Sequence, residues 1–114
     1  MKILLEKNEK LKCIQDSMSN EESIDIVEFD MLEENIDLRY DLLIIYCDSI
    51  EDIDKYKNMN MGNVLMVTSN MNTKFLYSAI MILHPLDIIG TSLSQQSIHV
   101  RITSNIEFLK EDKV

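Results

Sequence analysis

Glycine and proline are scarce in this chain, with two glycines and one proline among its 114 residues. Sandwiches and barrels need many tight turns, so this scarcity disfavours an all-β fold. Aromatic residues are also few and tryptophan is absent, so isoleucine, leucine, valine and methionine must build the core. This composition favours an α/β or helical fold, and the length fits one domain over residues 1–114.

Long apolar runs are absent as well, since none approaches the ~20 residues of a membrane span. The first residues contain a short apolar run, but charge follows at once and no small-residue cleavage site appears. Cysteine is limited to Cys13 and Cys47, which are too far apart for a CxxC motif and lie inside apolar runs. We therefore expect a soluble cytoplasmic protein with two buried free thiols.

Positive charge is in short supply, because 20 acidic residues face 11 lysines and arginines and the formal net charge is −9. Nucleic acids and anionic membranes carry negative charge and would repel such a chain. We therefore expect neither as a direct partner, and we expect partner surfaces to be neutral or basic.

Residue types that build metal, cofactor or catalytic sites are not grouped in the sequence. His84 and His99 lie fifteen residues apart with no further ligands at suitable spacing. There is no glycine-rich phosphate loop, because Gly62 and Gly90 are isolated. We therefore expect no metal, no cofactor and no enzymatic activity.

What the chain does contain is a series of short apolar runs separated by amphipathic segments. Apolar runs of this length without alternation predict strands buried on both faces of a parallel sheet. The expected strands are Lys2–Leu5, Ile24–Phe29, Leu42–Tyr46, Val64–Thr68 and Leu86–Ile89.

Three of the intervening segments have apolar residues at helical spacing, which predicts helices with one buried face. Their apolar positions are Leu11, Ile14 and Met18 in Glu9–Met18, Phe75, Ala79 and Leu83 in Asn72–Leu83, and Ile98, Ile102, Ile106 and Leu109 after the N-cap candidate Ser94.

The other two crossovers are short, so we expect shortened second and third helices. Only one or two helical turns fit between Phe29 and Asp41, where Glu33, Glu34 and Asp37 would form a solvated face. Residues Ser49–Lys57 predict one acidic helix, opened by a capping box of Ser49 and Asp52. The alternation predicts an open parallel sheet covered on both faces, with functional groups at the carboxyl ends of the strands.

Four strand regions carry motifs that resemble the receiver domains of two-component response regulators. VLMVTSNMN (residues 64–72) is similar to the fourth strand of that family, and YDLLIIYCDS (residues 40–49) to the third. KILLEKN and LDIIGTSLSQQSI are similar to the first strand and to the region around the fifth. The resemblance extends from Lys2 to about Leu109 and implies a five-stranded, flavodoxin-like (βα)5 fold.

The hallmark residues of the family are largely replaced. The resemblance places Tyr46 where the phosphoacceptor aspartate belongs, Glu6 and Lys7 where two acids hold Mg²⁺, and Gly90 and Thr91 where a lysine belongs. A tyrosine hydroxyl titrates near pH 10 and is bulky, so it cannot replace an attacking carboxylate. We therefore predict a degenerate pocket made of Glu6, Lys7, Tyr46, Asp48, Thr68, Gly90 and Thr91.

Asp48 leaves an alternative open, because a shift of two residues would make it the phosphoacceptor. The chain would then be a Mg²⁺-dependent receiver that uses Asp48, Glu6 and Thr68. In the interpretation that we prefer, Asp48 is an exposed loop or cap residue and Thr68 is a strand-end residue satisfied locally. A third possibility is a small-molecule sensor that uses the vacated pocket.

The segment Asn72–Leu83 has more apolar residues than one buried face needs. Phe75, Leu76, Tyr77, Ile80 and Met81 cannot all point at one sheet, so we expect some at a partner surface. In receivers this helix, the fifth strand and the last helix form the face for dimerisation and output-domain contacts. A thick core helix covered by its neighbours is the alternative.

The resemblance therefore implies a non-catalytic regulatory domain, similar to that of atypical orphan response regulators. It would act in transcription regulation without phosphorylation, through a homodimer or a partner protein. A C-terminal DNA-binding output domain would lie outside this chain, which holds no output domain of its own.

Overall fold

The computed structural model describes residues 1–18, 24–30, 40–57 and 62–111. Strands and helices alternate along them, as the apolar pattern predicts. The elements are β1 (Lys2–Glu6), the 3-10 helix η1 (Glu9–Leu11), α1 (Lys12–Met18), β2 (Asp25–Phe29), β3 (Leu42–Tyr46), α2 (Ile50–Tyr56), β4 (Val64–Thr68), α3 (Thr73–Leu83), β5 (Asp87–Gly90) and α4 (Gln95–Glu111).

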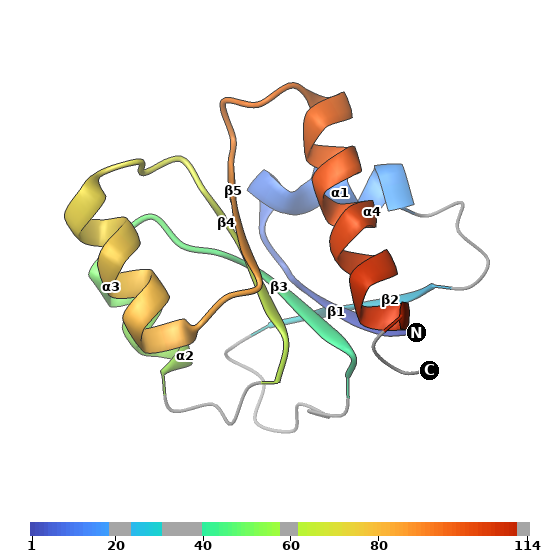
Figure 1. Ribbon diagram of the computed structural model, residues 1–114, viewed down its shortest axis with the longest axis horizontal. Coiled ribbons are helices and arrows are strands. Elements are labelled where there is room, and N and C mark those ends of the chain that lie inside the picture. The colour runs from blue at the N-terminus through green and yellow to red at the C-terminus, as the bar shows by residue number, and fades with distance from the viewer. Residues whose placement is uncertain (19–23, 31–39, 58–61, 112–114) are drawn as a thin grey trace.

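The five strands form one parallel sheet in the order β2-β1-β3-β4-β5 (Figure 1). The chain first adds β2 on one side of β1 and then continues with β3 on the other side. All strands run the same way, so their carboxyl ends meet at one edge of the sheet. The predicted five-stranded, flavodoxin-like α/β fold is confirmed.

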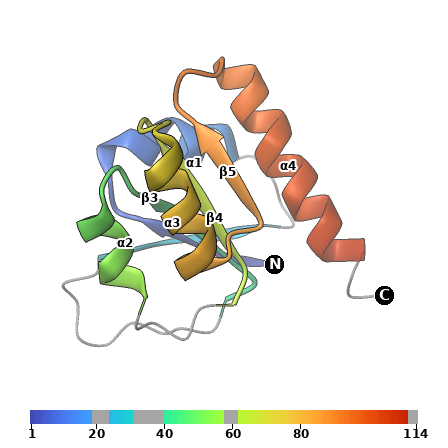
Figure 2. The same cartoon turned by 60° about the vertical axis from the view of Figure 1, so that its left-hand side comes forward.

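Helices cover both faces of the sheet, α1 and α4 on one side and α2 and α3 on the other (Figure 2). Every residue of β3 and β4 is buried, because these strands have a neighbour on each edge and helices on each face. This double burial explains why their sequences are continuously apolar.

The amphipathic stripes predicted for the helices are confirmed. Leu11, Ile14 and Met18 are buried under η1 and α1, Phe75, Ala79 and Leu83 under α3, and Ile98, Ile102, Ile106 and Leu109 under α4. The short third helix is confirmed in α2, whereas the short second helix, with Glu33, Glu34 and Asp37, lies outside the described residues.

The predicted caps are present with one change of partner. Ser94 Oγ accepts from the Ser97 N–H at 3.1 Å and begins α4. Ser49 Oγ accepts from the Asp52 N–H at 3.2 Å and begins α2. The Asp52 carboxylate, however, accepts from the N–H of Asp48 at 2.9 Å. The acid therefore reaches one residue further back than a capping box requires.

Two burial predictions are wrong. Strand β2 is not buried on both faces, because Asp25, Val27 and Glu28 are exposed and β1 is its only strand neighbour within the described sheet. Cys13 is exposed, because Ile14 and Met18 occupy the inner side of α1; Cys47 is buried as expected. Along the described residues, no helix has the length and apolar character needed to cross a membrane.

Candidate functional site

The carboxyl ends of β1, β3 and β4 bring polar side chains together at one edge of the sheet. Glu6 ends β1, Tyr46 ends β3 and Thr68 ends β4. The two residues after Tyr46 lead to Asp48, and Ser69 and Asn70 follow Thr68. We call the group of Tyr46, Asp48, Thr68, Ser69 and Asn70 the Asp48 network.

Both carboxylate oxygens of Asp48 are engaged. Oδ1 accepts from the Thr68 hydroxyl at 3.1 Å, the Ser69 N–H at 2.8 Å and the Ser69 hydroxyl at 2.9 Å. Oδ2 accepts from the Tyr46 hydroxyl at 2.6 Å. Four donors on two neighbouring strands therefore converge on one carboxylate.

The main chain of Asp48 is also bonded. Its N–H donates to Asp52, and its C=O accepts from Asn70 Nδ2 at 2.8 Å. Asp48 is half-buried, so the expectation of an exposed loop residue is wrong. The reason lies in the loop after β4, which folds back and places three donors beside the carboxylate.

These contacts shift the pKa values of the acid and the phenol in opposite directions. Burial alone would raise the pKa of Asp48, but hydrogen bonds from Tyr46, Ser69 and Thr68 hold it below its usual value. Burial, together with the bond to the Asp48 carboxylate, raises the pKa of Tyr46. The pair is therefore a phenol that donates to a carboxylate.

Thr68 is fully buried, and its hydroxyl accepts from the Asn70 N–H at 3.0 Å while it donates to Asp48. The prediction of a locally satisfied strand-end residue is confirmed for the contact with Asn70. Sequence reasoning missed the roles of Ser69 and Asn70. Their only signal is that small polar residues directly follow a buried strand.

Glu6 serves the sheet more than the network. Its Oε2 accepts from the backbone N–H of Tyr46 at 2.8 Å, where β1 and β3 separate. Burial raises the pKa of Glu6, despite the hydrogen bond from Tyr46 and the nearby Tyr56 phenol, which lower it. Lys7, the next residue, is exposed.

Gly90 and Thr91 join the site only through the backbone, because the Thr91 N–H donates to the Thr68 C=O at 2.9 Å. Gly90 is buried and Thr91 is exposed. The structure thus gathers Tyr46, Asp48 and Thr68 into one network, with Glu6 bonded at its margin. Within the described part of the chain, no three side chains of His, Cys, Asp or Glu are placed to hold a metal ion.

A second feature is an apolar surface that runs from α3 across the edge strand β5 to α4 (Figure 2). Of the five residues predicted for an interface, Phe75 is buried in the core and Leu76 is half-buried. Tyr77, Ile80 and Met81 are 64%, 49% and 55% exposed. We call the following exposed residues the apolar face: Tyr77, Ile80, Met81, Leu86, Leu93 and Val100.

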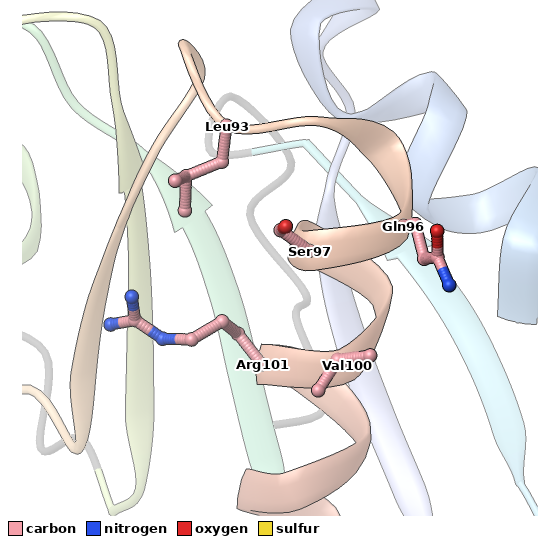
Figure 3. Close-up of a pocket in the computed structure, with 5 residues that line it drawn as sticks. All are labelled: Leu93, Gln96, Ser97, Val100 and Arg101. Atoms are coloured by element: carbon pink, nitrogen blue, oxygen red, sulfur yellow. The ribbon is translucent and has the colours of Figure 1, made fainter.

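The α4 side of this face contains a cavity of about 390 Å³ (Figure 3). Leu93 and Arg101 are directed into the space between β5 and α4, and Val100 lies one turn along the helix from Ser97. Arg101 is not free, since its Nε donates to Asp87 Oδ2 at 2.8 Å and a second nitrogen contacts Asp87 Oδ1. The Asp87 charge at the edge of the face is therefore paired.

Arg101 and Asn105 together orient Asp87. Asn105 Nδ2 donates to the same carboxylate at 3.1 Å. Although burial opposes it, the hydrogen bonds from these two side chains lower the pKa of Asp87. The carboxylate is thus ionised and neutralised within the chain.

Comparison with known proteins finds no matching family model and no matching curated protein. Among solved structures, the chain is similar to the signal receiver domain of a modulated diguanylate cyclase from Desulfovibrio desulfuricans G20. The two share 15% sequence identity, the alignment covers 97% of each chain, and the TM-score is 0.62. The chain therefore has the fold of a receiver domain.

Proposed function

We propose that this chain is a non-catalytic regulatory domain that acts through protein contacts and without aspartate phosphorylation. The observation that carries the proposal is the Asp48 carboxylate, which four donors already engage. Support for a signalling role comes from the fold, because the structural neighbour is itself a signal receiver domain. A cytoplasmic location and a place in an atypical response regulator belong to the same proposal.

Phosphoryl transfer to an aspartate needs an accessible carboxylate nucleophile and a cation beside it. Tyr46 stands where the resemblance places the nucleophile. Asp48, the alternative, has a lowered pKa and donors on both oxygens, which make it a weak nucleophile. The Thr68 hydroxyl and the Ser69 N–H, which would otherwise be available to a phosphoryl group, bind this carboxylate instead.

The distribution of charge supports the apolar face as the contact surface. Residues 69–106, which contain α3, β5 and most of α4, hold one acidic residue, Asp87, and two basic residues, Lys74 and Arg101. The other 76 residues hold 19 acidic and 9 basic residues. This side of an acidic molecule is therefore nearly neutral, and a second copy can approach it with little repulsion.

We therefore propose self-association through the apolar face, with Tyr77 near its centre on α3. Large exposed aromatic and aliphatic side chains on a neutral surface are typical of interaction sites. The same face is available to an output domain or to a separate partner protein. DNA binding and transcription regulation would belong to such an output domain, because the acidic surface elsewhere repels nucleic acid.

The phosphorylation half of the proposal is tested with acetyl phosphate and Mg²⁺. The intact mass of the chain should not change, and Mg²⁺ alone should not raise the melting temperature. Asp48→Asn is the matched control, because it removes the only alternative acceptor. A gain of one phosphoryl mass that disappears in Asp48→Asn would show that the chain is a phospho-accepting receiver.

The contact half is tested by molar mass in solution. We expect the parent chain to dimerise and Tyr77→Glu to be monomeric, because the substitution introduces a charge into an apolar contact. Cys13→Glu is the matched control, since it adds the same charge at an exposed position on α1. A monomeric parent, or a dimer that Tyr77→Glu leaves unchanged, would contradict the proposed contact.

A further inference from the structure

We infer that Asp48 is a positioning residue for α3: its carboxylate fixes the segment that begins this helix and so orients the apolar face. The second half of this inference rests on the proposed function, because it concerns the face used for self-association. The first half rests only on contacts within the chain.

The first link joins two loops that follow neighbouring strands. Asp48 lies after β3, and its side chain accepts from the Ser69 N–H and hydroxyl after β4. Its C=O accepts from Asn70 Nδ2 at 2.8 Å. Asp48 thus bonds to two consecutive residues of the β4–α3 loop, through its side chain and its backbone.

The second link continues from Asn70 into the helix. Asn70 Oδ1 accepts from the Asn72 N–H at 3.0 Å. Asn72 is the N-cap of α3, and its Oδ1 accepts from the Lys74 N–H at 3.0 Å and the Phe75 N–H at 3.4 Å. An unbroken series of hydrogen bonds therefore leads from Asp48 to the first turn of α3.

Apolar packing does little to hold this segment. Residues 71–74 are exposed, and Phe75 is the first buried side chain after Thr68. The hydrogen bonds are therefore what define the path between β4 and Phe75. Since a helix is a rigid element, the placement of its first turn also sets where Tyr77, Ile80 and Met81 point.

The charge of Asp48 matters beyond its shape. Hydrogen bonds to an ionised acceptor are stronger than those between neutral groups. Asp48→Asn keeps Oδ1 as an acceptor but removes the charge and turns Oδ2 into a donor that faces the Tyr46 hydroxyl. The variant should therefore fold while weakening the first link.

Amide hydrogen exchange tests the inference on the folded chain. We expect Asp48→Asn to accelerate exchange of the Ser69, Asn72, Lys74 and Phe75 amides about tenfold, with α4 amides much less affected. Asn70→Ala should have the same effect on Asn72, Lys74 and Phe75, because it removes the second link. Glu51→Gln, an exposed neutralisation on α2, is the matched control and should change none of them.

Exchange that is unchanged in Asp48→Asn, or that rises equally in α3 and α4, would overturn the inference. Self-association then tests the orientation of the face: Asp48→Asn should weaken the dimer about tenfold, although no residue of the network belongs to the apolar face. A local exchange effect with an unchanged dimer would overturn the link to the face. A parent chain that never associates would overturn that link and the proposed dimer together, while the exchange result still decides the role of Asp48 at α3.

Discussion

At the scale of single residues, Glu6 and Asp48 show how the number of donors decides the state of a carboxylate. They lie at the ends of neighbouring strands and both are half-buried. Asp48 accepts four hydrogen bonds, which more than compensate for the loss of water, so its pKa falls. Glu6 has the Tyr46 N–H as its printed donor, and burial prevails, so its pKa rises.

This contrast predicts opposite pH dependence for two neutralising substitutions. The raised pKa of Glu6 means that the folded state binds its proton more tightly than the unfolded state. Wild-type stability is therefore lowered as pH rises through the window between the unfolded and folded pKa values, and the penalty is complete near neutral pH. Glu6→Gln should unfold at a higher denaturant concentration than wild type at about pH 7 and lose this advantage at acid pH.

Asp48→Asn should show the reverse. The lowered pKa of Asp48 contributes stability above its unfolded pKa, and this contribution is lost as pH falls through the folded value. The deficit of Asp48→Asn should therefore be largest near neutral pH and shrink in acid. Denaturant titrations of wild type and both variants at several pH values measure this, and parallel curves would contradict the assignment.

The sequence predicted some residues of the site and missed others for a physical reason. The ends of β3 and β4 follow from the apolar runs, so Tyr46 and Thr68 could be placed at one edge of the sheet. The partnership of Asp48 with Ser69 and Asn70 spans more than twenty residues and depends on how the β4–α3 loop folds back. Loop geometry of this kind leaves no periodic signal.

At the scale of elements, the helix end at His84 carries visible strain. His84 caps α3 with φ of 48°, in the left-handed region, and its N–H donates to the Ile80 C=O. Left-handed backbone disfavours residues with a Cβ, and Pro85 restricts the preceding residue further. Glycine is the usual residue at such a helix end.

His84→Gly should therefore stabilise the chain. The left-handed conformation costs a side-chain residue about 1–2 kcal/mol, and the greater freedom of unfolded glycine offsets about 0.5–1 kcal/mol of the gain. We expect a net increase of up to about 1 kcal/mol in the free energy of unfolding, which thermal unfolding would report as a few degrees. His99→Gly, inside α4, is the control and should destabilise by about 1 kcal/mol. A similar loss in both variants would show that the His84 side chain, and not its backbone, stabilises the helix end.

Elements were predictable wherever burial imposed a period. Strands β3 and β4 begin and end at the predicted residues, and α3 and α4 bury the predicted stripes. The exposure of β2 could not be predicted, because an apolar run does not reveal whether a strand lies at the edge of a sheet. Phe75 was assigned to both the core and a possible interface, and only the orientation of α3 decides for the core.

At the scale of the whole molecule, the uneven distribution of charge separates two kinds of surface. Most acidic residues lie outside residues 69–106, whereas Asp87 and Arg101 neutralise each other inside this region. Net charge of one sign opposes self-association at long range, and a neutral face removes only the short-range part of that repulsion. The strength of self-association should therefore depend on screening.

We predict that NaCl strengthens the proposed dimer. Two copies with a formal charge of −9 each repel one another, and the screening length shrinks from about 10 Å at 0.1 M salt to about 3 Å at 1 M. Apolar contacts at Tyr77, Ile80 and Met81 do not depend on charge pairing, so screening removes the repulsion and leaves the attraction. Sedimentation equilibrium across this range should show the dissociation constant falling with salt. Sulfate would be a poor choice, because it strengthens apolar burial by itself. An interface held by ion pairs would instead weaken as NaCl rises, and that result would place the contact on the charged surface outside residues 69–106.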